Sequence, residues 1–74
     1  MHARVSYHAK RIMSYLEQHP HSMDTAEGIM RWWIKDNHYD LATVNAALDL
    51  LEREGKVKRD IRSDGKQYFS LIFQ

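Results

Sequence analysis

The sequence predicts an α+β fold in which a three-helix bundle is followed by a C-terminal β-hairpin. Three segments between residues 6 and 54 place apolar residues at helical spacing. After Gly55 the spacing of apolar residues changes from about 3.6 to about 2, the period of a strand. Asp64-Gly65 then supplies a strong hairpin-turn signal. Because 74 residues are enough for one domain and too few for two, we expect a single domain over residues 1–74.

The first two predicted helices have recognisable end signals. We expect the first to span about residues 6–18 and to end before Pro20, because the residue before a proline avoids the helical conformation. We expect the second to span about residues 25–35 and to begin at a capping box in which Asp24 is the N-cap and Glu27 reaches back. Gly28 lies inside this helix, where it either allows close helix packing or faces solvent. The two apolar faces consist of Val5, Ala9, Ile12, Met13 and Leu16, and of Ala26, Ile29, Met30 and Trp33.

The third predicted helix spans about residues 41–54 and follows a polar connection over residues 36–40. Asp40 is a good N-cap, and Gly55 provides the left-handed stop. We expect the hairpin over about residues 56–73. Its core-facing residues are predicted to be Val57, Ile61, Phe69 and Leu71.

Two stretches of the chain resemble a known family. The run from Ala42 to Arg59 is similar to the recognition helix and first wing strand of bacterial winged-helix transcriptional regulators, in a minimal MarR/ArsR-like form. The runs 64–66 and 68–71 are similar to the wing turn and the closing strand. The resemblance covers about residues 20–73. It implies a winged helix-turn-helix fold and a regulator that binds double-stranded DNA.

A DNA-binding function assigns a role to the exposed face of the third helix, which lies in the major groove in such domains. Residues of its first two turns are expected to reach base edges: Ala42, Thr43, Asn45 and Ala46. Asn45 suits a bidentate bond to adenine, and Thr43 or an alanine suits a thymine methyl. Phosphate contacts are expected from Arg53, Lys58, Arg59, Arg62 and Lys66.

Positive charge is concentrated near the C-terminal third of the chain. The whole chain has a net charge of only +1, whereas residues 53–66 carry six basic and three acidic side chains. A dedicated nucleic-acid binder usually has a larger basic excess. Basic side chains on an exposed hairpin also protect an edge strand from aggregation, which is a second explanation for this cluster.

Acidic side chains on the third helix favour an alternative function. Asp49 lies near the middle of the exposed face with Glu52 at its flank, where phosphates repel them, and we expect Arg53 to neutralise Asp49 from four residues away. The alternative is a protein-docking module. It would use Leu50 with the alanines of this face as an apolar ledge, and Trp32 as an anchor. Trp32 is equally suited to complete the edge of the core. A homodimer is a further option, for which the remaining apolar residues are Tyr7, Tyr15, Trp32, Ile72 and Phe73.

Other function classes find no support in the sequence. The chain has no cysteine, and its five histidines lack metal-ligand spacing, so we expect them on the surface without a metal. Glycine-rich phosphate loops and nucleophile motifs are missing, so we expect neither catalysis nor a cofactor. A chain of this size has little room for a ligand pocket of roughly 300 Å³ or more, and no small-molecule substrate is evident. No segment has the length or composition of a membrane span or a signal peptide, so we expect a cytoplasmic protein.

Overall fold

The computed structural model describes residues 3–34 and 40–73. Within these ranges the chain is α+β. Helix α1 (Ala3–Gln18) is followed by strand β1 (Met23–Asp24), helix α2 (Ala26–Gly28) and the π-helix η1 (Ile29–Ile34). Helix α3 (Leu41–Arg53) then leads into strands β2 (Val57–Ile61) and β3 (Gln67–Leu71). The order of elements is compatible with a winged-helix topology.

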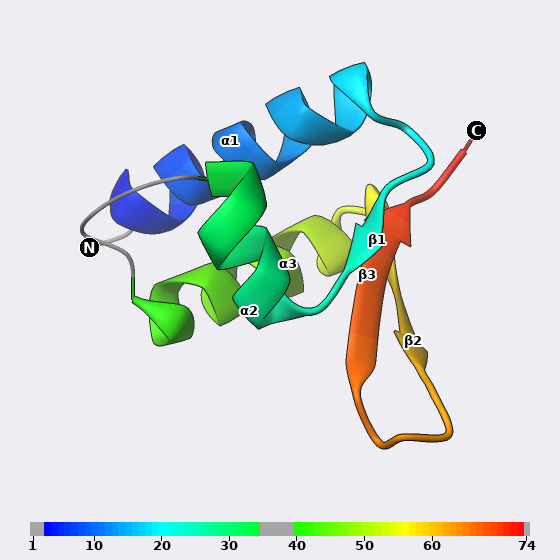
Figure 1. Ribbon diagram of the computed structural model, residues 1–74. Helices are drawn as coiled ribbons and strands as arrows, with labels where there is room; N and C mark the ends of the chain where they lie inside the picture. The colour runs from blue at the N-terminus through cyan, green and yellow to red at the C-terminus, as the bar shows by residue number, and fades with distance from the viewer. Residues whose placement is uncertain (1–2, 35–39, 74) are drawn as a thin grey trace.

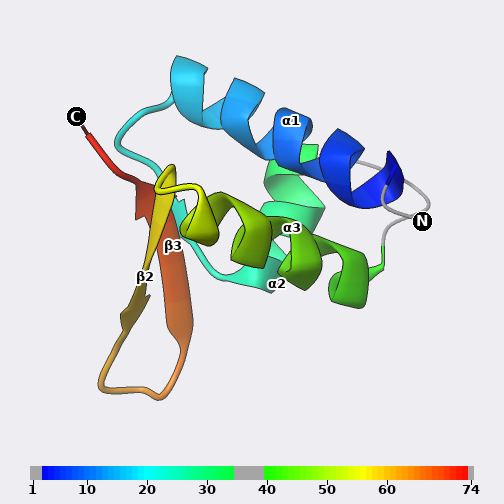
Figure 2. The same ribbon diagram turned by 180° about the vertical axis from the view of Figure 1, so that it is seen from behind.

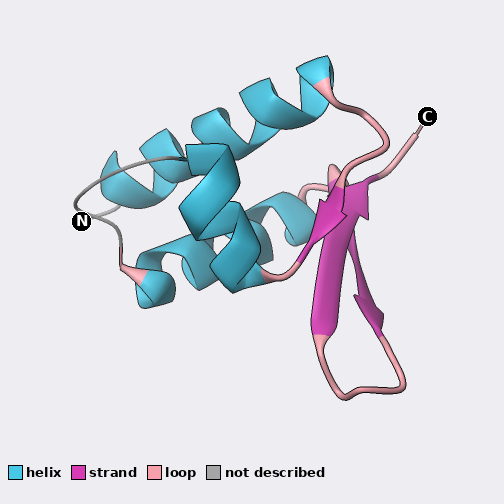
Figure 3. Cartoon of the chain, in the orientation of Figure 1, coloured by secondary structure: helices cyan, strands magenta, loops and turns pink. Residues whose placement is uncertain are grey.

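Helices and sheet occupy two sides of the molecule (Figure 1). The helices pack together on one side, and the β2–β3 hairpin projects beyond them (Figure 3). The sheet is antiparallel with the strand order β1-β3-β2, so β3 is central and β2 forms an edge. Seen from behind, α3 runs toward the sheet and turns directly into β2 (Figure 2).

One core joins the helices to the sheet. Of the predicted apolar face of α1, Ala9, Ile12 and Leu16 are buried, and Val5 and Met13 are half-buried and pack against the core. Trp33 is also buried and its ring stacks on Tyr15 of α1, with 4.7 Å between ring centroids. The sheet adds Val57 and Phe69 to this core. The fully or nearly buried apolar residues are Ala9, Ile12, Leu16, Ile29, Trp33, Val44, Ala47, Leu48, Leu51, Val57 and Phe69.

The prediction for the core face of the hairpin is correct at one end and wrong at the other. Val57 and Phe69 are buried and Leu71 packs against the core, but Ile61 is 71% exposed. Ile61 pairs with Gln67 at the far end of the hairpin. It ends β2 next to the hairpin turn, the part of the hairpin that projects beyond the helices (Figure 1).

The start of the second helical segment differs from the predicted capping box. The N-cap is Thr25, whose hydroxyl oxygen accepts a hydrogen bond from the backbone N–H of Gly28 at 3.2 Å. Asp24 instead lies in β1, a two-residue strand that the sequence did not predict, and its carboxylate accepts from the backbone N–H of Thr25 at 2.8 Å. Helix α1 begins at Ala3, before the predicted residue 6. Lys35 and the predicted connection over residues 36–39 lie outside the described residues.

Two further predictions are corrected by the packing. At Gly28, where we expected the close approach of a second helix or solvent, the group that a Cβ would meet first is the Asp24 carboxylate. His8 is buried at 1% exposure, whereas we expected surface histidines. Its Nδ1 lies 2.7 Å from the carbonyl oxygen of Arg4, one turn earlier in α1. That local partner satisfies one ring nitrogen, whereas Nε2 is buried with no hydrogen-bond partner among the described residues.

Candidate nucleic-acid interface

Helix α3 is capped and exposes one polar face. The carboxylate of Asp40 accepts from the backbone N–H of Ala42 and from the hydroxyl of Thr43, both at 3.1 Å, which confirms Asp40 as the N-cap. The hydroxyl of Thr43 is therefore already engaged at the helix start. Ala42 and Asn45 are exposed and Ala46 is half-buried. Of the residues predicted to reach bases, Asn45 has the freest polar side chain.

The hairpin is held beside α3 by two tight turns. Gly55 follows α3 with a φ of 73°, the left-handed conformation in which glycine has no steric penalty. Gly65 has a φ of 83° in the turn between β2 and β3, where its N–H donates to the carbonyl of Arg62 at 2.9 Å. The turn therefore lies where Asp64-Gly65 predicted it. The Gly55 turn brings the start of β2 beside the end of α3, and the Gly65 turn brings β3 beside β2.

Arg59 joins the hairpin to α3. Its Nη2 lies 2.6 Å from a carboxylate oxygen of Asp49 and 2.9 Å from one of Glu52. Its Nη1 donates to the side-chain oxygen of Gln67 at 3.0 Å, and its guanidinium carbon lies 5.0 Å from the centroid of the Phe69 ring. Arg59 therefore replaces Arg53 as the partner of Asp49. Its contacts also occupy the guanidinium that we expected on a phosphate.

The other predicted phosphate contacts lie on two faces of the sheet. Cross-strand pairing places Arg59 with Phe69 on the core face, and Lys58 with Ser70 on the opposite face. Arg62 shares that opposite face. Its guanidinium stacks on Tyr68 at 5.3 Å, and its Nη2 lies 2.9 Å from the sulfur of Met23. The basic cluster of the sequence is thus divided and does not form one continuous stripe.

Two predicted cations remain on the α3 side. Arg53 is exposed in the last turn of α3, and Lys66 is exposed where the hairpin turn enters β3. Neither side chain has an ion pair or hydrogen bond within residues 3–34 and 40–73. Both are therefore available to an anionic ligand.

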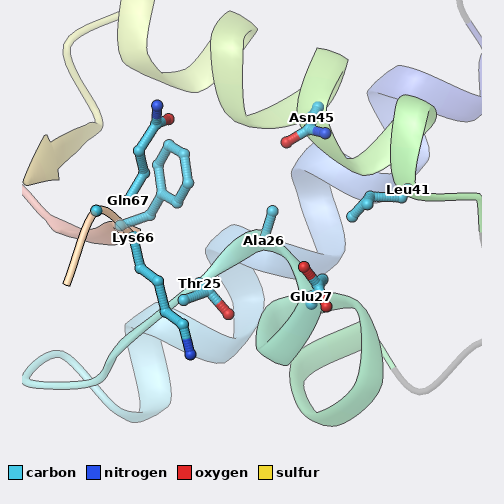
Figure 4. A pocket seen from close by; sticks show the side chains of 9 residues that line it. Thr25, Ala26, Glu27, Leu41, Asn45, Lys66 and Gln67 are labelled. Atoms are coloured by element: carbon cyan, nitrogen blue, oxygen red, sulfur yellow. The ribbon is translucent and has the colours of Figure 1, made fainter. Parts of the chain in front are cut away.

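A groove of about 410 Å³ lies between α2, α3 and the hairpin. We call it the α3–hairpin groove. Its α3 wall has Leu41 and Asn45, and its α2 wall has Thr25, Ala26 and Glu27. Figure 4 shows Gln67 extending toward α3 and Lys66 toward the side of Thr25. The volume exceeds what we expected of so small a chain, because the hairpin projects past the helices and leaves a concave angle.

Sequence reasoning found two lining residues, Asn45 and Lys66, and missed Gln67 and the α2 wall. A signal for Gln67 was present. The alternation of the hairpin places Arg59 on the same face as Val57, so Arg59 and its cross-strand neighbours had to face α3. The α2 wall had no such signal, because α2 meets β3 through tertiary packing, next to the pairing of β1 with β3.

The predicted docking residues differ in exposure. Trp32 is 61% exposed on η1, beside the buried Trp33. Leu50 is half-buried and packs against the core, so it adds little to the ledge expected with Ala42 and Ala46. Among the other apolar residues considered for a homodimer, Tyr7 is 50% exposed and Phe73 is 63% exposed. Tyr15 packs against the core, and Ile72 is half-buried.

The described ranges contain no group of three or more histidine or acidic side chains arranged to hold a metal ion. They also contain no helix with the length and apolar character of a membrane span. Comparisons of the chain with protein-family models, curated proteins and solved structures found no match.

Proposed function

We propose that this chain is a winged-helix DNA-binding domain with a role in transcription regulation. Helix α3 enters the major groove, and the β2–β3 hairpin is the wing that lies against the DNA backbone. The observation that carries the proposal is the α3–hairpin groove, which places the amide of Asn45 opposite Lys66 and Gln67. Amides suit base edges, and a free lysine suits a phosphate.

Arg59 supports the proposal because it compensates the acidic side chains of α3. Unpaired carboxylates on a recognition helix would repel phosphates. Asp49 and Glu52 share the Arg59 guanidinium at 2.6 and 2.9 Å, and Arg53 adds another positive charge in the last turn. The exposed face of α3 is thereby close to neutral, and the free charge of Lys66 can direct the DNA toward the groove.

The proposal predicts weak, salt-dependent affinity for any duplex. Two free cations on the α3 side correspond to two phosphate contacts, so log K should fall with log salt with a slope of roughly −2. The measurement is fluorescence anisotropy of a labelled random duplex at several salt concentrations. Absence of binding at low salt contradicts the proposal.

Matched charge deletions test which face binds. Lys66→Ala removes one positive charge from the groove side, and Lys58→Ala removes one from the opposite face of the sheet. We expect Lys66→Ala to weaken binding and to reduce the salt slope by about 1. Lys58→Ala should leave both nearly unchanged. Equal losses in the two variants would indicate a response to net charge alone.

A protein-docking function is the second candidate, favoured by the exposed indole of Trp32. Exposed tryptophans are frequent interface anchors. In this case Trp32→Ala removes a protein partner, or a second copy of the chain, without changing duplex affinity. Sedimentation of the wild type and of this variant distinguishes the homodimer from the monomer.

A further inference from the structure

We propose that Arg59 is a positioning residue that fixes the side-chain amide of Gln67 with its oxygen toward the protein and its N–H donors toward DNA. Gln67 thereby becomes a specificity-determining residue that selects bases with an acceptor in the major groove. This inference rests on the proposed DNA-binding function and adds the residue that chooses the sequence.

The chemistry of arginine settles the orientation of the Gln67 amide. The guanidinium group has only donors, so the amide atom that faces it must be the oxygen. This oxygen accepts from Nη1 of Arg59 at 3.0 Å. The amide nitrogen of Gln67 makes no side-chain hydrogen bond in the described part of the chain, and Gln67 is exposed at the groove. Its two N–H groups are therefore left for a ligand.

Arg59 is held on several sides, which keeps the amide in place. Nη2 is fixed by Asp49 and Glu52, and the plane of the guanidinium lies near the Phe69 ring. The side chain is only 28% exposed. A rotation of the Arg59 guanidinium that released Gln67 would also break its contacts at Nη2. Nη1 binds a residue of β3 while Nη2 binds residues of α3. The planar fork of donors in arginine suits this geometry, and the single ammonium of lysine does not.

A fixed donor reads bases differently from a freely rotating amide. A free glutamine donates and accepts, as in its paired bonds to adenine. With its oxygen turned toward Arg59, Gln67 presents its N–H donors to the base. Guanine offers two acceptors in the major groove, whereas cytosine offers a donor. At the position that Gln67 contacts, affinity should therefore be highest with guanine and lowest with cytosine.

The test uses the full chain and duplexes selected from a random library. The selected duplex is measured by anisotropy with each base at every position. For the wild type we expect one position to prefer guanine over cytosine by roughly tenfold. Gln67→Met should remove that preference without changing the salt slope, because it removes no positive charge. Gln67→Glu keeps an acceptor for Arg59 but offers no donor, so the preference should move toward cytosine, to which carboxylates bind.

Variants of Arg59 separate positioning from charge compensation. Arg59→Met leaves Asp49 and Glu52 unpaired, so affinity for every duplex should fall. Adding Asp49→Asn and Glu52→Gln removes the repulsion and should restore affinity for unselected duplex. The base preference should stay lost, because Gln67 is still free to rotate. Recovery of the preference in this triple variant would overturn the positioning role.

The outcomes distinguish this inference from the proposed function. If the wild type binds no duplex, both are overturned. If it binds with a preference that persists in Gln67→Met, only this inference is overturned. A measurement without DNA adds an independent check. The Nη protons of Arg59 should be separately resolved in ¹⁵N spectra and protected from exchange, whereas averaged, rapidly exchanging signals would show that the amide is not held.

Discussion

Gly28 has no Cβ, and the Asp24 carboxylate occupies the space that a Cβ would need. Alanine is ordinarily better than glycine in a helix by about 1 kcal/mol. Here a Cβ would displace the Asp24 carboxylate, which accepts from the N–H of Thr25 at 2.8 Å. We therefore expect Gly28→Ala to give no gain in the free energy of unfolding. In an Asp24→Ala background the same substitution should stabilise the chain by about 0.5–1 kcal/mol.

Urea unfolding of the four proteins in this cycle measures the difference. The two single variants, the double variant and the wild type should show a coupling of about 1 kcal/mol between positions 24 and 28. If Gly28→Ala is equally stabilising in both backgrounds, the carboxylate does not occupy the space at Gly28.

Asp40 is the second residue whose removal has a defined local effect. Its carboxylate satisfies the N–H of Ala42 and the hydroxyl of Thr43 at the start of α3. Asp40→Ala should lower the free energy of unfolding by about 1 kcal/mol, as for other lost N-caps. Asp40→Asn, which retains an acceptor, should cost much less. Thermal unfolding of both variants tests the cap, and equal losses would indicate a role of charge alone.

At the scale of elements, the spacing of apolar residues predicts the helices and strands that bury a face in the core. It does not predict short strands or surfaces formed by tertiary packing. The helical spacing of Val44, Leu48 and Leu51 identifies α3 because those residues must meet α1 and the sheet. The two residues of β1 are too few to show a period, so this strand could not be predicted. Ile61 continues the alternation of β2, but the pattern contains no information on where the helices stop covering the strand. The same limit hides the α3–hairpin groove, because its walls meet only through tertiary packing.

The two ends of the hairpin should therefore respond differently to mutation. Phe69 is 3% exposed and Ile61 is 71% exposed. Phe69→Ala should destabilise the chain by about 3–5 kcal/mol, as for other buried aromatic residues. Ile61→Thr keeps a β-branched side chain on the surface and should change stability by less than about 0.5 kcal/mol.

Urea unfolding compares the two variants with the wild type. A large loss for Ile61→Thr would mean that the tip of the hairpin is covered in solution, for instance by a second copy of the chain. Repeating the measurement at several protein concentrations distinguishes that cause, because only an oligomer has a concentration-dependent midpoint.

At the scale of the whole molecule, Arg59 connects stability to the proposed function. The hairpin is held to the helices by the buried residues Val57 and Phe69 and by the polar contacts of Arg59 with α3. The polar contacts are partly exposed, so they add little stability compared with the apolar core. The core holds the hairpin in place, and Arg59 contacts the side chains of Asp49, Glu52 and Gln67 beside the groove.

Since the sheet and the helices share one core, we expect them to unfold in a single transition. Small domains usually unfold cooperatively. Here the buried residues of the strands and of the helices form one apolar core. In a Trp32→Phe variant the fluorescence comes from Trp33 alone, which stacks on Tyr15 and reports on the helices. Its transition in urea should coincide with that of far-ultraviolet circular dichroism.

Hydrogen exchange should give the most protected amides of β3 and α3 similar opening free energies, within about 1 kcal/mol. Clearly weaker protection of β3, with native Trp33 fluorescence retained, would mean that the hairpin opens independently of the helices.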